Sequence, residues 1–458
     1  MSNTACVNKK NETIKVEHHD CADEEVPLVS NETYVSLDIG TSSVKVVVSE
    51  IAGGSINILG VGSVPSEGIK KGAVVDIDET VKSIKRAVEQ AERMVGIKIE
   101  HVVVGVNGSH IELTPCHGVV AVSSPDREIN VEDVRRVIDA SQVMSIPPER
   151  EVIDVIPKQF IVDGLDEITD PRGMIGVRLE MEGTLITGSK TVLHNLLRCV
   201  ERAGLSIAEI SLNSLATGSV AVSKDEKSLG VCVIEIGGGS TTVSVFEQGS
   251  LVALSVLPIG GDHITNDLAV GLKLTTEEAE RVKCKHGHAF VPEASTEEQI
   301  TIQKIGSNER HTITQQELAG IIEPRVEEII ELCAKELVRL GFKQFPSGFV
   351  LTGGAVMMPG VLELTKDMLE GNVRVAIPNY IGVREPRYTV SIGLIHFAHK
   401  NGRVQGKEIA AAFSQSEVNQ EEANPVATSK RSKRKEVEQP QEEKKESKMK
   451  SWFKTFFD

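Results

Sequence analysis

One local pattern, a strand followed by a glycine turn and a second strand, occurs twice in this chain and constrains the fold more than any other feature. Residues 34–49 read YVSLDIGTSSVKVVVS, and residues 231–246 read VCVIEIGGGSTTVSVF. In each copy an apolar strand ends in an acid, Asp38 or Glu235, and is followed by Ile, Gly, a small hydroxyl-rich turn and a second apolar strand. A repeat at domain-scale separation predicts two similar lobes that face one another. The alternative is chance similarity between two glycine-rich hairpins.

The first copy has the chemistry of a phosphate-binding turn. Glycine at Gly40 lets the backbone approach a phosphate closely, and successive N–H groups of such a turn bind anions. The hydroxyls of Thr41 and Ser42 add donors, and Lys45 offers a compact cation to the same phosphates. Asp38 is expected to hold Mg²⁺ through a water, because this ion gives up its hydration shell reluctantly. An ordinary hairpin turn without a ligand is the alternative.

The second copy predicts a phosphate turn more strongly, because its consecutive glycines cost backbone entropy that an ordinary hairpin avoids. Its phosphate-binding candidates are Gly237, Gly238, Gly239, Ser240 and Thr241. A third glycine turn follows late in the chain, where FVLTGGAVMMPG (residues 349–360) predicts a strand, the turn Thr352-Gly353-Gly354 and a helix that starts near Gly360. Here a base or ribose would lie against bare backbone at Gly353 and Gly354.

The chain has 458 residues, of which 40% are hydrophobic and 25% are charged, and this composition is ordinary for a globular α/β protein. The net charge of −16 argues against nonspecific nucleic-acid binding, so no nucleic-acid partner is expected. No apolar run is long enough to span a bilayer, no signal peptide is recognised, and the seven scattered cysteines suggest reduced thiols in the cytoplasm. Cys284, His286 and His288 resemble a metal cluster, but no second ligand pair has zinc spacing, so a polar segment after a helix is the favoured interpretation.

The order of the three glycine turns resembles the actin, Hsp70 and sugar-kinase superfamily. Within it, the chain is similar to the FtsA family of bacterial actin-like cell-division proteins. The motifs that carry this resemblance are YVSLDIGTSSVKV, VGVNGSHI, EVIDVIPKQFIVDG, EGTLITGSK, LGVCVIEIGGGSTTVSVF, TTEEAERVK and FVLTGGAVMMPG. They span residues 31–400 without a large gap. The resemblance implies an α/β, actin-like, two-lobed ATPase fold with a family-specific inserted subdomain and with ATP and Mg²⁺ as cofactors.

The resemblance also implies the domain boundaries. A disordered tail is expected at 1–30, followed by the first lobe with the first phosphate turn at 31–113, an inserted small α/β subdomain at 114–192 and the continued first lobe at 193–228. The second lobe is expected to comprise the second phosphate turn at 229–261, an outer subdomain at 262–340, and the adenosine turn with a return helix at 341–400. A flexible linker at 401–447 and an amphipathic membrane-targeting helix at 448–458 are expected to follow. Periodicity supports a helix at 79–95, N-capped by Asp78, and predicts in the insert a helix at 131–143 and strands at 152–160 and 178–186. A structureless insert is the alternative.

By the same resemblance, Glu280 and Lys283 border the adenosine, and their i, i+3 spacing places both on one helix face. A solvated ion pair is an equally acceptable interpretation. One departure from the family concerns Glu235, because related ATPases usually carry Asp there. The additional methylene displaces the carboxylate by about 1.5 Å, and Mg²⁺ tolerates little change in geometry. ATP binding is therefore expected, with weak or absent hydrolysis and no assignable catalytic residue.

The last eleven residues predict a membrane-binding helix. Met449, Trp452, Phe453, Phe456 and Phe457 fall on one helical stripe, and Lys450 and Lys454 flank it. A single short tip should bind an anionic membrane reversibly, and a polymer with many tips should bind by avidity. Docking of this helix into a protein groove is the alternative.

The resemblance implies a cell-division protein on the cytoplasmic side of the membrane at the division site. It would self-assemble and would contact FtsZ, the tubulin-like division GTPase, through residues 262–340 and later division proteins through the insert. A pilus-assembly-type ATPase or another superfamily kinase is the alternative. A sugar kinase would need a general base in the cleft, and an Hsp70-like chaperone would need a β-rich domain after residue 400.

Overall fold

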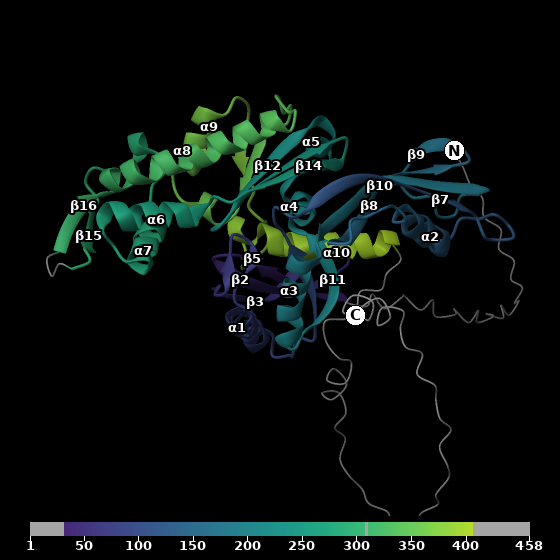
Figure 1. The fold of residues 1–458 in the computed structure, drawn as a ribbon, viewed down its shortest axis with the longest axis horizontal. Helices are drawn as coiled ribbons and strands as arrows, with labels where there is room; N and C mark the ends of the chain where they lie inside the picture. The colour runs from purple at the N-terminus through teal and green to yellow at the C-terminus, as the bar shows by residue number, and fades with distance from the viewer. Residues whose placement is uncertain (1–31, 307–309, 406–458) are drawn as a thin grey trace, which may run out of the picture. The chain divides into compact units, whose positions relative to one another are not determined.

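A computed structural model describes residues 32–306 and 310–405 (Figure 1). The predicted tail at 1–30, the membrane-targeting helix at 448–458 and all but the first five residues of the predicted linker lie outside these residues.

The first lobe is built on a five-stranded sheet of order β11-β6-β1-β2-β3. Strands β1, β2 and β3 form an antiparallel meander, and β6 and β11 add parallel strands on the other side of β1. The central strands are Val-rich and buried on both faces, as expected for a sheet covered by helices. The strands are β1 (Glu32–Ile39), β2 (Ser43–Ala52), β3 (Ser55–Pro65), β6 (His101–Val106) and β11 (Ser206–Leu212), and a small hairpin is formed by β4 (Ile69–Lys70) and β5 (Ala73–Val74).

The second lobe repeats the same topology. Its sheet has the order β14-β13-β12-β17-β18, with an antiparallel meander β12–β13–β14 and parallel strands β17 and β18 beside β12. The strands are β12 (Val231–Ile236), β13 (Thr241–Glu247), β14 (Ser250–Leu257), β17 (Phe349–Thr352) and β18 (Val373–Val375). This match of strand order and direction confirms the duplication that the two sequence copies predicted.

Helices cover these sheets where small residues allow a close approach. A Cβ at Gly62 of β3 would lie 1.9 Å from the carbonyl oxygen of Ala87 in α1, so only glycine fits under this helix. Helix α10 packs against α4 and β1, and Gly393 touches the backbone of Ala216 in the same way. The helices of this region are α1 (Ile77–Val95), α3 (Lys190–Arg202), α4 (Asn213–Ala221), α5 (Lys224–Leu229) and α10 (Thr389–Gln405), and α9 (Val361–Met368) packs on β18.

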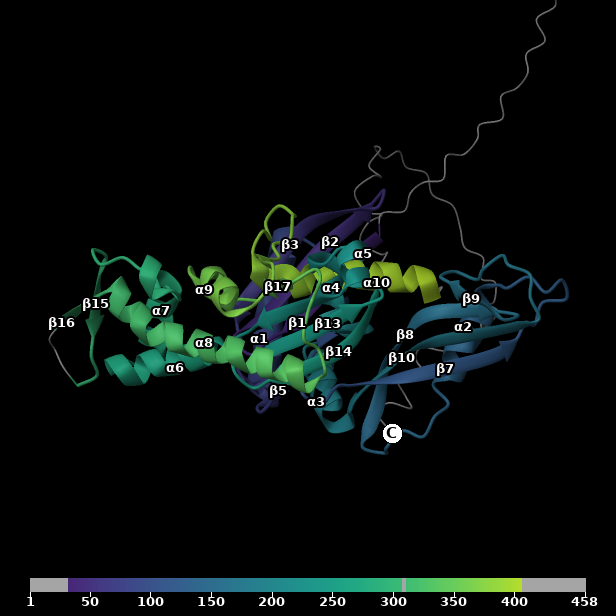
Figure 2. The ribbon, with the colours of Figure 1, turned by 90° about the horizontal axis from the view of Figure 1, so that it is seen from above.

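Two further units extend the lobes (Figures 1 and 2). The insert is a four-stranded antiparallel sheet of order β7-β10-β8-β9 covered by α2, with its own core around Phe160, Leu179 and Met181. In the outer unit of the second lobe, α6, α7 and α8 pack together beside the hairpin β15–β16. The elements are β7 (Glu112–Ala121), α2 (Val131–Ser141), β8 (Arg150–Val162), β9 (Leu165–Ile168), β10 (Arg178–Ser189), α6 (Gly261–Leu272), α7 (Thr276–His286), β15 (Gln299–Gln303), β16 (Arg310–Thr314) and α8 (Gln315–Arg339), with 3₁₀ turns η1 (Val291–Glu293), η2 (Ala355–Met357) and η3 (Pro386–Tyr388).

Three sequence predictions differ from the structure at element ends. Helix α1 is capped by Asp76, whose extended backbone lets its carboxylate accept the Glu79 amide, and Asp78 lies inside the first turn. Helix α2 ends at Ser141, not at residue 143. Helix α10 continues to Gln405, past the predicted start of the linker at 401. Local propensity places element ends less sharply than element centres.

Candidate functional site

The two predicted phosphate turns are geometrically equivalent. In turn 1 (residues 40–43) the Gly40 amide donates to the Ser43 carbonyl at 3.1 Å, and in turn 2 (residues 237–240) the Gly237 amide donates to the Ser240 carbonyl at 2.9 Å. Both turns connect the first two antiparallel strands of their sheets. The duplication therefore extends to hydrogen bonds of the turns.

The two turns touch each other, and this contact explains two of the glycines. A Cβ at Gly238 would lie 1.7 Å from the Ser42 hydroxyl oxygen, and one at Gly239 would lie 2.8 Å from the Thr41 side chain. Neither glycine has a positive φ, so backbone conformation alone does not require them. Turn 2 is bare because the side chains of turn 1 occupy the space beside it.

The contact between the lobes is also polar. The Ser42 hydroxyl donates to Asp262 Oδ1 at 3.3 Å, and the Asp262 amide donates to the Gly238 carbonyl at 2.8 Å. The Thr241 hydroxyl donates to the Ile259 carbonyl at 2.8 Å and is fully buried. A phosphate that recruited the hydroxyl of Ser42 or Thr241 would have to replace these acceptors.

The acids that end the first strand of each hairpin share one lysine. Asp38 faces Lys45 across the β1–β2 register, and the Lys45 ammonium lies 2.9 Å from the Asp38 carboxylate in a buried ion pair. At the equivalent cross-strand position in the second lobe, Thr242 faces Glu235, so this carboxylate has no cation on its own hairpin. The hydroxyl of Thr217 donates to Glu235 at 3.4 Å.

This arrangement favours a proton on Glu235. Burial raises the pKa of Glu235 to about 7, repulsion from the Asp38 carboxylate adds to the rise, and Lys45 and the Thr217 hydrogen bond oppose it. The folded chain therefore binds this proton more tightly than the unfolded chain does, where the pKa is 4.5. Stability falls as pH rises from the unfolded to the folded pKa.

Replacing Glu235 with glutamine should remove this pH-dependent cost. Without metal, the wild type should lose stability between about pH 6 and about pH 8.5, and Glu235→Gln should not. The free energy of unfolding of the variant minus that of the wild type should therefore be about 1 kcal/mol larger at about pH 8.5 than at about pH 6. Urea denaturation at the two pH values measures this difference, and any effect of the amide that does not depend on pH cancels. A difference of zero or of opposite sign would show that Glu235 ionises freely in the fold.

The donor set fits Mg²⁺ bound through water and phosphate. Asp38 and Glu235 supply hard carboxylate oxygens, and the positive charge of an ion would offset their mutual repulsion. Within residues 32–306 and 310–405, no group of three or more His, Cys, Asp or Glu residues could hold a metal on protein ligands alone. A site made of Asp38, Glu235 and nucleotide phosphates would match the coordination of Mg²⁺ in proteins, where one or two carboxylates and substrate phosphates usually bind the ion.

The third glycine turn lies directly beside turn 2. A Cβ at Gly353 would lie 2.4 Å from the Ile236 carbonyl oxygen, and Gly353 has a φ of +98°, whereas Gly354 faces open space. The Lys283 ammonium donates to the Gly261 carbonyl at 3.0 Å and lies 2.6 Å from the Glu280 carboxylate. The structure thus brings the predicted adenosine residues to the edge of turn 2.

Lys283 and Glu280 are not a freely solvated pair. The Lys283 side chain is 9% exposed, and the Thr265 hydroxyl bonds both residues. Burial acts to raise the pKa of Glu280, but the Lys283 ammonium and hydrogen bonds from Thr265 and Cys284 outweigh burial and lower it. The Lys283 side chain is therefore held in place at the site by Gly261, Thr265 and Glu280.

Sequence reasoning gave no role to Asn107, which also joins the two lobes. The Asn107 amide donates to the Thr242 hydroxyl at 2.9 Å, and its own oxygen is buried and finds no partner among the residues that the structure describes. Asn107 directly follows β6, which runs parallel to β1, so it emerges at the same sheet edge as turn 1. The rule that ligands bind at the carboxyl ends of parallel strands could have identified it.

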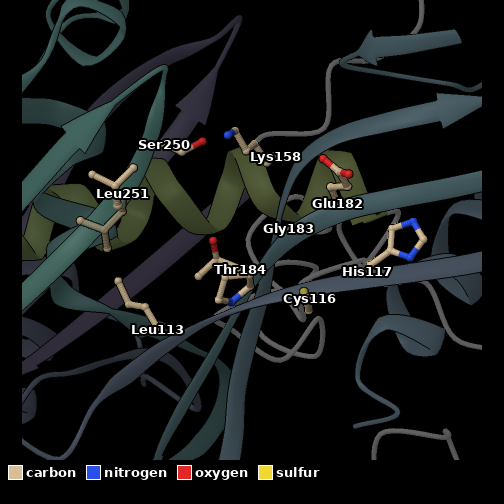
Figure 3. A pocket seen from close by; sticks show the side chains of 11 residues that line it. Leu113, Cys116, His117, Lys158, Glu182, Gly183, Thr184, Ser250 and Leu251 are labelled. Atoms are coloured by element: carbon tan, nitrogen blue, oxygen red, sulfur yellow. The ribbon is translucent and has the colours of Figure 1, made fainter.

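Two other features lie outside the three turns. Cys284 and His286 belong to the last turns of α7 rather than to a segment after it, and they bond to Glu280 and Glu298. A cavity of about 520 Å³ lies between the insert and β14, with Lys158, His117 and Ser250 among its lining residues (Figure 3). None of its lining residues belongs to the three turns.

No helix of the described part of the chain is long and apolar enough to cross a bilayer.

Comparison with known families gives two matches along the chain. A family model described as "Cell division protein FtsA" matches residues 232–393, and one described as "SHS2 domain inserted in FTSA" matches residues 108–187. Proteins named cell division protein FtsA are 61% identical over 83% of this chain and 86% of the Bacillus subtilis protein, and 43% identical over 80% of this chain and 83% of the Enterococcus faecalis protein. The Escherichia coli protein is 33% identical over 81% of this chain and 92% of its own length.

Comparison with solved structures supports the fold. A chain of the PilM-PilN type IV pilus biogenesis complex superposes with a TM-score of 0.55, at 19% identity, over 79% of this chain and 97% of that one. The fold is therefore α/β and actin-like, with an SHS2 insertion.

Proposed function

The chain belongs to the FtsA family of cell division proteins, and we propose that it binds Mg-ATP between its two lobes. We further propose that it self-assembles and tethers the FtsZ ring to the inner face of the cytoplasmic membrane. The observation that carries the nucleotide part is the meeting of turn 1 and turn 2, with Asp38 and Glu235 behind them and the third glycine turn, turn 3 (residues 352–354), beside them. Backbone amides, hydroxyls and Lys283 would hold the nucleotide, and the carboxylates would hold Mg²⁺, which supplies charge neutralisation for the phosphates.

Hydrolysis is proposed to be weak or absent. The Glu235 carboxylate is buried, its pKa is raised to about 7, and it carries an additional methylene compared with aspartate. Such a carboxyl can help to hold Mg²⁺ through water, but its displacement and partial protonation would keep the ion from the regular octahedral geometry that hydrolysis needs. Binding of the nucleotide, rather than its hydrolysis, would then control assembly.

The remaining assignments rest on the family. Residues 262–340 are proposed to contact FtsZ, and the insert, expected at 114–192, is proposed to contact neighbouring copies and later division proteins. The boundaries of these segments stay predictions. The pilus-assembly alternative has only the fold in its favour, because the PilM-PilN chain is 19% identical.

Deleting residues 448–458 should abolish sedimentation of the protein with anionic liposomes. The aromatic stripe of Trp452, Phe453, Phe456 and Phe457 supplies the apolar area, and Lys450 and Lys454 supply attraction to anionic lipid. Co-sedimentation with ATP, with ADP and without nucleotide measures binding, and electron microscopy of the same samples detects filaments. Avidity predicts that ATP-dependent assembly strengthens the binding of the full chain.

The basic cluster at residues 430–435 of the linker provides a matched control. Neutralising its lysines removes positive charge near the C-terminus but leaves the aromatic stripe intact. This variant should still sediment with liposomes at moderate salt. Unchanged sedimentation of the 448–458 deletion would contradict the membrane-tether proposal and would favour docking of the tip on a protein.

A further inference from the structure

A two-residue hairpin tip, Lys71-Gly72, is bonded to turn 1. Strands β4 and β5 pair so that Lys70 faces Ala73, and the Gly72 amide donates to Thr41 Oγ1 at 3.3 Å. The Ser66 amide, just before this hairpin, donates to the Ser42 carbonyl at 3.1 Å. The segment from residue 66 to residue 72 is thus fixed to the predicted phosphate turn at two points.

The tip has an uncommon backbone for a lysine. Lys71 has a φ of +49° and Gly72 a φ of +76°, the pattern of a type I′ turn, in which Asn, Asp or Gly usually occupies the first position. A residue with a long side chain at positive φ costs some stability. This lysine is therefore not the residue that the turn itself prefers.

The bond from Gly72 leaves the Thr41 hydroxyl able to act on a ligand. A hydroxyl carries one donor and two acceptor lone pairs, so Thr41 Oγ1 can accept the Gly72 amide and still donate its proton to a phosphate oxygen. Thr41 also lies where turn 1 meets Gly239 of turn 2. A phosphate held by both turns would lie beside this hydroxyl.

Lys71 is within reach of the same point. Lys71 directly precedes Gly72, whose amide bonds Thr41. An extended lysine side chain places its ammonium about 6 Å from its own Cα. Lys71 is exposed, and across residues 32–306 and 310–405 it forms no ion pair. Lys45, the lysine expected at the phosphates from sequence, is buried and lies 2.9 Å from the Asp38 carboxylate. Lys70 of the same hairpin is exposed as well, but Lys71 occupies the tip, next to the Gly72 amide that bonds Thr41.

We propose that Lys71 binds the terminal phosphate of the nucleotide and so makes the site discriminate a nucleoside triphosphate from a diphosphate. The terminal phosphate is the part of the ligand farthest from turn 3, which belongs to the second lobe, and the hairpin approaches turn 1 from the first lobe. A lysine ammonium is a compact, flexible cation suited to a phosphate that carries most of the charge. This inference rests on the proposed nucleotide site.

The test compares ATP and ADP affinities, with Mg²⁺, of the full chain and its variants. Lys71→Gln should weaken ATP binding about tenfold and change ADP binding less than about twofold. Lys71→Arg, which keeps the charge, should restore most of the ATP affinity. Lys85→Gln removes another exposed lysine of the same lobe, on α1, and should leave both affinities unchanged.

A glycine at this position separates binding from a structural role. Lys71→Gly relieves the positive φ, so it should raise the melting temperature and still lose the discrimination between ATP and ADP. A purely structural lysine would give the gain in stability without the loss of discrimination. Equal changes, or no change, in the affinities of Lys71→Gln for the two nucleotides would overturn the inference. A wild-type chain that binds neither nucleotide would overturn the proposed site itself, which is a distinct result.

Discussion

Replacing Gly353 with alanine should reduce the free energy of unfolding by about 3 kcal/mol or more, because the new methyl group meets backbone and the residue keeps a positive φ. The added Cβ would lie 2.4 Å from the Ile236 carbonyl oxygen, and the φ of Gly353 is +98°. Ile236 ends β12, which is paired with β13 and with β17, so its carbonyl cannot shift without disturbing the sheet. Urea denaturation measures the loss.

The neighbouring glycine provides the matched control. A Cβ at Gly354 meets nothing within 4 Å, and the residue has an ordinary helical conformation. Gly354→Ala should therefore keep the stability of the wild type and bind ATP about tenfold more weakly, because the methyl group would occupy space expected for the adenosine. Equal stability of the two variants would contradict the packing of turn 3 on β12. Unchanged ATP affinity of Gly354→Ala would contradict the predicted role of turn 3.

Replacing Lys45 with methionine should strongly destabilise the chain. It leaves the buried Asp38 carboxylate without its partner at 2.9 Å and removes the positive charge that, within the described residues, lowers the pKa of Glu235. Removing one member of a buried ion pair costs about 3–5 kcal/mol. Thermal and urea unfolding should show this loss, and Mg²⁺ with ATP should recover part of it by neutralising the two acids.

A double variant separates lost packing from lost charge compensation. Lys45→Met combined with Asp38→Leu removes both charges, and apolar replacement of a buried pair is often neutral. The double variant should therefore be more stable than Lys45→Met alone, although it should no longer respond to Mg²⁺. If the double variant is less stable than either single variant, the ion pair is not the source of the effect.

Local patterns were sufficient to predict the framework of this fold. The repeated strand, acid, glycine and strand sequence predicted two equivalent hairpins, and the structure confirms matching sheets around β1 and β12. The helix predicted at 79–95 is α1, and Val81, Ile84, Val88 and Ala91 of its apolar stripe are buried. Val95, the last residue of the predicted stripe, is only half-buried. These features succeed because strand and helix periodicity is set by residues close in sequence.

Contacts between distant segments were not predictable in this way. The bond from Ser42 to Asp262 joins residues 220 apart, and the bond from Asn107 to Thr242 joins residues 135 apart. The sequence suggested that the glycines of turn 2 leave room for phosphate, but the structure shows Thr41 and Ser42 beside Gly239 and Gly238. Only the packing of one lobe on the other reveals this second reason. The phosphate-binding role of both turns stays a prediction.

Calorimetric titration of the full chain with ATP in the presence of Mg²⁺ measures whether turns 1 and 2 together bind one triphosphate, with Asp38 and Glu235 holding its metal. The predicted result is a saturable heat with about one ATP per chain, weakened when Mg²⁺ is removed. Absence of any heat of binding at concentrations where the chain is folded would contradict it.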